Sequence, residues 1–171
     1  MNVERVPKGV ILGLAASWVK AFTEPRLQLV AERFLPPSPA QKRDVGADPS
    51  GHPENMPPAV VVGRVARALG HDGLTDDQRV RIQLFIHYTF GSGLGVAYSV
   101  AASRSPAVRL GRGSLAGLAI YAGSHGSVLP LLGIQRPPWR LAPAAVVWES
   151  ASHVVFGAAL EAGRSLLGAR P

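Results

Sequence analysis

Six ionisable side chains lie inside apolar stretches of the sequence, where a charge needs a partner or a function. They are Lys20, Glu24, His87, His125, Glu149 and His153. Two pairs among them are four residues apart, so the members of each pair share one helix face and can form an ion pair. Imidazole titrates near pH 6.5, and a desolvated carboxylate can be shifted to meet it. The six residues therefore predict a pathway for protons or ions in a membrane protein. Such a protein would take part in the response of the cell to envelope or acid stress.

The same residue types allow a second interpretation as metal ligands. Imidazole and carboxylate bind zinc, iron or manganese, and two histidines on different helices can bind a haem. In this alternative, a metal ion or haem is the cofactor of a redox-complex subunit, and its ligands are His87, His125, Glu149 and His153. Three residues separate Glu149 from His153, a spacing that differs by one from the Glu-x-x-His of di-iron bundles. A third interpretation makes the same residues structural pairs in an assembly subunit.

The sequence carries no enzyme signature. It contains no cysteine, which excludes disulfides, iron–sulfur clusters and thiol nucleophiles. Ser124 and Ser152 each neighbour a histidine along the chain, which provides no triad geometry. The formal charge is +7, but the basic residues do not form a face that also carries aromatic residues. We therefore expect no nucleic-acid partner. A non-enzymatic protein is the expectation.

Composition favours a membrane protein. Of the 171 residues, 47% are hydrophobic and only 17% are charged, whereas about a quarter are charged in a soluble domain. Four stretches approach the roughly 20 apolar residues that cross a bilayer: residues 6–23, 82–102, 114–134 and 142–160. These features predict one all-α integral membrane domain over residues 1–171, with four transmembrane helices. Its expected partners are the lipid bilayer and either further copies of the chain or subunits of a membrane complex.

A long connection, residues 25–81, separates the first two predicted spans. Its proline-rich part, residues 36–58, is predicted to be mostly irregular. Residues 59–69 have helical spacing, with Arg64 and Arg67 on one side. The sequence from Thr75 to Gln78 fits a capping box that begins the next helix.

The distribution of basic residues predicts the orientation. Basic residues in the short flanking segments place both termini in the cytoplasm by the positive-inside rule. Antiparallel crossings then bring all six ionisable residues into one half of the membrane. In the third span, Pro130 is expected to kink or end the helix because it lacks an amide proton.

Small residues recur four apart. The pairs are Gly9 with Gly13, Gly91 with Gly95, Gly113 with Gly117, and Ala119 with Gly123. Small side chains allow helix backbones to approach closely. The pairs therefore predict close helix–helix contacts.

Four segments resemble the YagU-like family of bacterial inner-membrane proteins. They are WVKAFTEP, IHYTFGSGLGVAY, SHGSVLPLLGIQRPP and ESASHVVFG, which begin at Trp18, Ile86, Ser124 and Glu149. Together they contain all six ionisable residues. The resemblance implies a multi-pass protein of the bacterial inner membrane. The family has no established activity or cofactor, so the resemblance assigns no functional residue.

Overall fold

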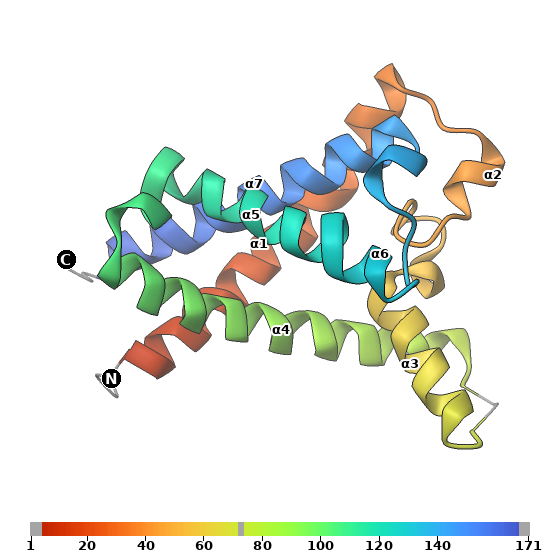
Figure 1. The fold of residues 1–171 in the computed structure, drawn as a ribbon, viewed down its shortest axis with the longest axis horizontal. Helices are drawn as coiled ribbons and strands as arrows, with labels where there is room; N and C mark the ends of the chain where they lie inside the picture. Colours follow the sequence, from red (N-terminus) through yellow and green to blue (C-terminus); the bar gives the residue numbers. More distant parts are fainter. Residues whose placement is uncertain (1–4, 72–73, 168–171) are drawn as a thin grey trace. The chain divides into compact units, whose positions relative to one another are not determined.

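The computed structural model describes residues 5–71 and 74–167. Every regular element in these ranges is helical, which confirms the all-α class (Figure 1). The longest elements are α1 (Arg5–Phe34), α4 (Asp76–Arg104) and α7 (Pro143–Leu166).

The prediction of four transmembrane helices is wrong. Among the residues that the structure describes, no helix combines the length and the apolar composition that crossing a bilayer requires. The predicted spans are interrupted by polar and charged side chains or by breaks in the helix. The third span, for example, is divided into α5 (Ser114–Gly123), the π-helical turn η3 (Ser124–Val128) and the short α6 (Leu129–Leu131).

Local sequence features mark the starts of two helices. Helix α3 (Pro57–Ala68) begins with two prolines. Proline suits the first helical positions because an amide proton there would have no partner within the helix, and proline has none. The capping box before α4 is confirmed: the Thr75 amide donates to Gln78 Oε1 at 2.9 Å, and the Gln78 amide donates to Thr75 Oγ1 at 3.3 Å. The region predicted to be mostly irregular, residues 36–58, contains the short helices α2 (Pro39–Lys42) and η1 (Pro53–Asn55) and the first two residues of α3.

The described residues form two compact units. The first unit comprises residues 5–24, 88–121 and 150–167, and the second comprises residues 25–71, 74–87 and 122–149. Each of the helices α1, α4 and α7 is divided between the two units, with one part in the first unit and the other part in the second. Each unit is described by itself below.

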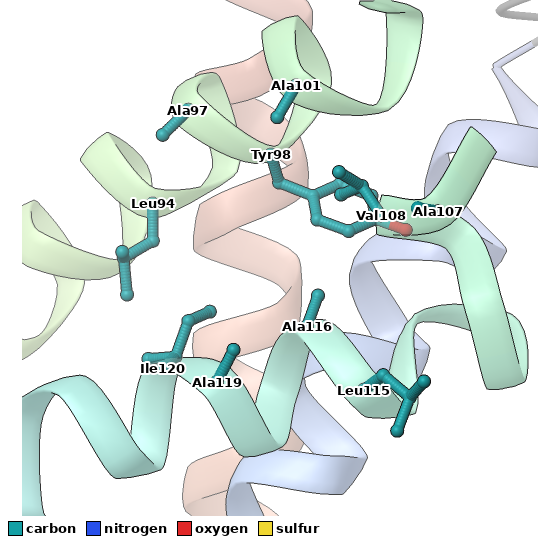
Figure 2. A pocket seen from close by; sticks show the side chains of 10 residues that line it. All are labelled: Leu94, Ala97, Tyr98, Ala101, Ala107, Val108, Leu115, Ala116, Ala119 and Ile120. Carbon is teal, nitrogen blue, oxygen red and sulfur yellow. The ribbon is translucent and has the colours of Figure 1, made fainter. Parts of the chain in front are cut away.

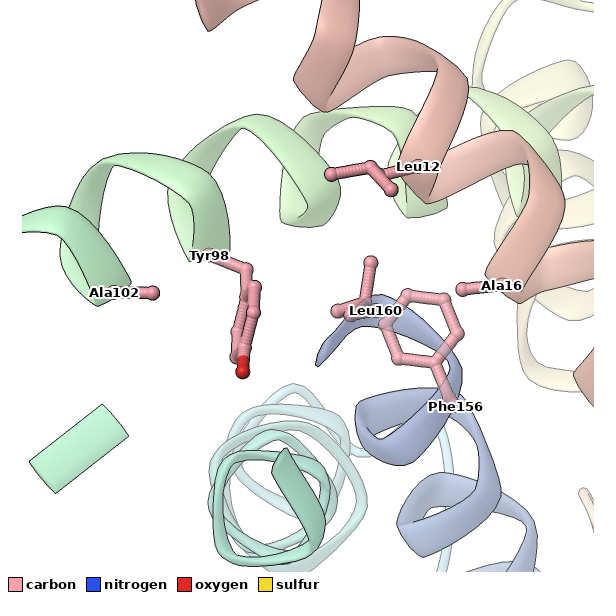
Figure 3. Packing of buried hydrophobic residues seen from close by; sticks show 6 residues of the cluster. All are labelled: Leu12, Ala16, Tyr98, Ala102, Phe156 and Leu160. Atoms are coloured by element: carbon pink, nitrogen blue, oxygen red, sulfur yellow. The ribbon is translucent and has the colours of Figure 1, made fainter. Parts of the chain in front are cut away.

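The first unit is built on two close helix crossings. Figure 3 shows its core, with Leu12 and Ala16 from α1, Tyr98 and Ala102 from α4, and Phe156 and Leu160 from α7. Helix α1 meets α4 at glycines: a Cβ on Gly95 would lie only 2.6 Å from the Gly13 Cα. Helix α5 meets α7 in the same way, since a Cβ on Gly157 would lie 2.9 Å from the Gly117 Cα.

These contacts confirm the predicted role of three of the small-residue pairs. The fourth pair, Ala119 with Gly123, is different, because no atom lies within 4 Å of the position of a Cβ on Gly123. A pair of small residues four apart is therefore not sufficient by itself for a close helix contact.

The second unit has a small alanine-rich core around one large side chain. Trp148, 1% exposed, packs with Ala31, Ala47, Ala142, Ala144 and Ala145. A polar network lies in the same unit. Gln28 donates to Asp48 Oδ1 at 2.6 Å, and Lys42 lies 2.6 Å from Glu32. These bonds attach the C-terminal part of α1 to α2 and to the segment that follows α2.

Candidate functional site

His125 lies in a π-helical turn, an uncommon element that is frequently found at functional sites. In η3 the amide of Leu129 donates to the carbonyl of Ser124, five residues earlier. Pro130 has no amide proton to offer the preceding turn, so the regular i to i−4 pattern cannot continue there. Helix α6 then ends at Leu131, which confirms the predicted effect of Pro130.

Three side chains of the second unit meet at this turn. The Nδ1 atom of His125 lies 2.9 Å from Glu149 Oε1 and 2.9 Å from Gln135 Oε1. The Nε2 atom of Gln135 donates to Glu149 Oε2 at 3.4 Å. Glu149 Oε1 and Gln135 Oε1 are both hydrogen-bond acceptors, so the His125 Nδ1 atom between them carries a proton. In the neutral ring, Nε2 is then the atom that can take up a second proton.

The three side chains differ in their access to the surroundings. The side chain of Glu149 is 2% exposed, whereas that of His125 is 14% exposed. A buried carboxylate is unfavourable without hydrogen-bond donors, and His125 and Gln135 supply such donors to Glu149. We call this group of three the His125 site. It consists of a fixed buried carboxylate next to an imidazole that is partly accessible.

Lys20 and Glu24 form the predicted ion pair, and they lie in the first unit. Their Nζ and Oε2 atoms are 2.7 Å apart, and each side chain is 11% exposed. The four-residue spacing on α1 explains the contact.

The other two predicted residues have different surroundings. His153, 7% exposed, lies in the first unit with its ring centroid 5.6 Å from that of Tyr121. His87 is half-buried on α4, in the second unit. The structure shows Glu149 bonded to His125, and the expected pairing of Glu149 with His153 stays a prediction. Within the two described ranges, no three His, Asp or Glu side chains are placed to hold a metal ion.

Gln135 is the site residue that the sequence did not indicate. It lies after α6, ten positions beyond His125, so no helical spacing connects the two. Gly133 has a left-handed backbone (φ 61°), which a residue with a side chain rarely adopts, and this turn redirects the chain before Gln135. The sequence Gly133-Ile134-Gln135 is the only available signal, and it indicates a turn rather than a ligand.

The surroundings of the Asp48 carboxylate in the second unit favour its ionised form. Burial alone would raise the pKa of Asp48. Hydrogen bonds from Gln28 and the Gly51 amide, together with the charge of Lys42, outweigh burial and lower that pKa below its ordinary value. The Glu32 carboxylate in turn raises the pKa of Lys42. The network is therefore ionic near neutral pH.

The first unit contains an apolar groove beside a buried ionic group. Figure 2 shows side chains of α4 and α5 that line this groove, with Tyr98 in its wall. The volume of the groove is about 440 Å³. The Tyr98 hydroxyl donates to Glu161 at 2.7 Å, and Arg164 donates two hydrogen bonds to the same carboxylate. Arg164 lowers the pKa of Glu161, and burial raises that of Tyr98.

Fold and site define an all-helical protein with a buried carboxylate–imidazole pair at a π-helical turn. The chain belongs to a family described as protein of unknown function (DUF1440), whose model matches residues 27–162. No curated protein and no solved structure matches the chain. The matched range includes the whole His125 site and excludes Lys20 and Glu24.

Proposed function

We propose that the protein is non-enzymatic and that the His125 site takes up and releases a proton as the surrounding pH changes. The observation that carries this proposal is the 2.9 Å contact between His125 Nδ1 and the buried Glu149 carboxylate. Imidazole is the side chain whose charge ordinarily changes between pH 5 and 8. A response to acid is the role that such a group would serve.

The geometry assigns a task to each member of the site. Glu149 orients the ring by accepting the Nδ1 proton, and it would neutralise the imidazolium that forms when Nε2 is protonated. Gln135 is uncharged and holds the second carboxylate oxygen. Proton uptake changes the charge of the His125–Glu149 pair from −1 to 0, so the attraction between η3 and α7 increases. The π-helical turn is the element that this change would act on.

Within the family of unknown function, we propose that the chain is YagU-like. The support is the resemblance of four segments, which include both His125 and Glu149. The location in the bacterial inner membrane came from that resemblance and stays a prediction.

Trp148 provides a local reporter for the test. It precedes Glu149 on α7 and is 1% exposed, whereas Trp18 and Trp139 are 60% and 78% exposed. A parent chain with Trp18→Phe and Trp139→Phe retains Trp148 as its only indole. We expect its emission to change between pH 5 and 8, and His125→Gln to remove this transition.

His71→Gln is the matched control, because His71 is exposed and its Nδ1 lies next to the Leu69 carbonyl. This variant loses one imidazole and should keep the Trp148 transition. A potentiometric titration should show that His125→Gln binds about one proton fewer than the parent over the same range. An unchanged Trp148 transition in His125→Gln would refute the proposal.

A further inference from the structure

Two arginines of the second unit converge on a glycine that has no side chain to fill the space between them. Gly63 is buried on α3. The atoms nearest to the position of a Cβ on Gly63 are Arg67 Nη1 at 3.6 Å and Arg79 Nε at 3.9 Å. Arg67 lies one turn along α3, and Arg79 comes from α4. Both guanidinium groups therefore border one point from two different helices.

The Arg79 side chain has an unused donor. Its Nε atom is buried without a hydrogen-bond partner, and so is Oε1 of Gln83, one turn further along α4. Buried polar atoms are nearly always hydrogen-bonded, so an exception needs an explanation. The ion pair of Arg79 with Asp76 does not supply one, because it joins Nη1 to Oδ1 at 3.6 Å and the Asp76 side chain is 73% exposed. Such surface pairs contribute little.

A third arginine nearby is already engaged. Arg64 donates to the carbonyl oxygens of Gly133 at 2.7 Å and Leu132 at 3.3 Å, so it caps the end of α6. Arg67 and Arg79 have no such carbonyl partner among the bonds described for them. Two like charges bordering the same space repel each other unless an anion lies between them.

We propose that Gly63, Arg67 and Arg79 form a binding site for an oxyanion, specifically a phosphate group. Guanidinium groups are planar and match phosphate oxygens with paired N–H donors. Because Gly63 has no side chain, the point that both guanidinium groups border is open to an oxygen atom of the anion. Gln83 adds an amide whose Oε1 atom can accept a hydrogen bond from hydrogen phosphate or, after rotation of the amide, whose NH2 group can donate one. The phosphate group comes either from a free phosphate compound or from a lipid headgroup. The site shares no residue with the His125 site.

Charge-matched variants on one helix test the proposal. Arg79→Gln and Arg81→Gln remove the same charge, but residues two apart lie on nearly opposite sides of a helix. The Arg81 side chain is 80% exposed, and it lies 3.8 Å from Asp77. Calorimetric titration with inorganic phosphate at constant ionic strength should show one saturable site in the wild type and in Arg81→Gln. We expect Arg79→Gln to raise the Kd about tenfold to a hundredfold, the loss expected for a charge-assisted hydrogen bond.

Gly63→Ala separates binding from folding. At 3.6 and 3.9 Å the added methyl group makes ordinary contacts, and alanine favours a helix over glycine. The variant should therefore melt at or above the wild-type temperature while it loses phosphate binding. A variant that binds phosphate as the wild type does would overturn the proposed geometry.

Vesicle flotation distinguishes the two sources of the phosphate group. Phosphatidylcholine vesicles with and without phosphatidic acid are the probes. Capture only by phosphatidic acid, lost in Arg79→Gln and kept in Arg81→Gln, identifies a lipid headgroup. Binding of inorganic phosphate without vesicle capture identifies a free phosphate compound. Binding of neither probe, or equal weakening by Arg79→Gln and Arg81→Gln, contradicts the proposal.

Discussion

The crossing of α1 and α4 in the first unit should tolerate no side chain at Gly95. An alanine Cβ at this position would lie 2.6 Å from the Gly13 Cα, and the Gly9 carbonyl oxygen is also in its way. Gly93 is on the same helix, and no atom lies within 4 Å of the position of its Cβ. Gly95→Ala and Gly93→Ala therefore differ in this contact and share the change in helix propensity.

The expected magnitude follows from these distances. Carbon atoms in contact stay about 3.5–4.0 Å apart, so α1 and α4 would have to separate by about 1 Å to admit the methyl group. Overpacking of this kind costs about 1–3 kcal/mol. Replacing a helical glycine with alanine contributes about 1 kcal/mol of stability in both variants. The free energy of unfolding of Gly95→Ala should therefore be lower than that of Gly93→Ala by about 1–3 kcal/mol.

Thermal unfolding followed by circular dichroism measures this difference. In a chain of this size, 1 kcal/mol corresponds to about 2–4 °C, so Gly95→Ala should melt about 2–12 °C below Gly93→Ala. Gly93→Ala should melt slightly above the wild type. If both variants melt at the same temperature, the backbones of α1 and α4 do not touch at Gly95 and the packing argument fails.

Three further outcomes are expected. Because the pKa of Asp48 is lowered in the folded protein, its ionised form stabilises the fold above the ordinary carboxyl pKa, and this stabilisation is lost as the pH falls through the lowered value. The stability difference between wild type and Asp48→Asn, measured by urea unfolding, should be constant above about pH 5 and shrink below about pH 4. Glu24→Gln should lower the unfolding free energy by about 3 kcal/mol, because it leaves the buried Lys20 without its carboxylate, and adding Lys20→Met should recover much of that loss in the same assay. Tyr98→Phe removes the hydrogen bond to Glu161 and should lower the free energy of unfolding by about 1–2 kcal/mol, measured by thermal unfolding.

Features that depend on neighbours three or four residues away could be predicted from the sequence. The Lys20–Glu24 ion pair, the capping box at Thr75 and the disturbance at Pro130 were all predicted correctly. Each depends on helix geometry that the local sequence imposes. The close approach at Gly9, Gly13, Gly91 and Gly95 was also predicted, although the spacing alone did not identify which helices meet.

The predicted membrane spans are wrong because charged side chains and breaks in the helix interrupt the apolar stretches. Residues 142–160 contain Glu149 and His153, and residues 114–134 contain a π-helical turn and a proline. Such stretches can equally form helices whose polar residues are buried against one another.

The sequence alone determined that the chain is helical, where most helices begin, and which ionisable groups are set among apolar neighbours. Tertiary structure decided which of those groups meet. Glu149 bonds to His125 from another helical segment and to Gln135 from the segment after a turn, and no spacing along one helix indicates either contact. The physical reason is that spacing fixes positions around a single helix, whereas contact between helices depends on how each is rotated and on where a turn such as that at Gly133 returns the chain.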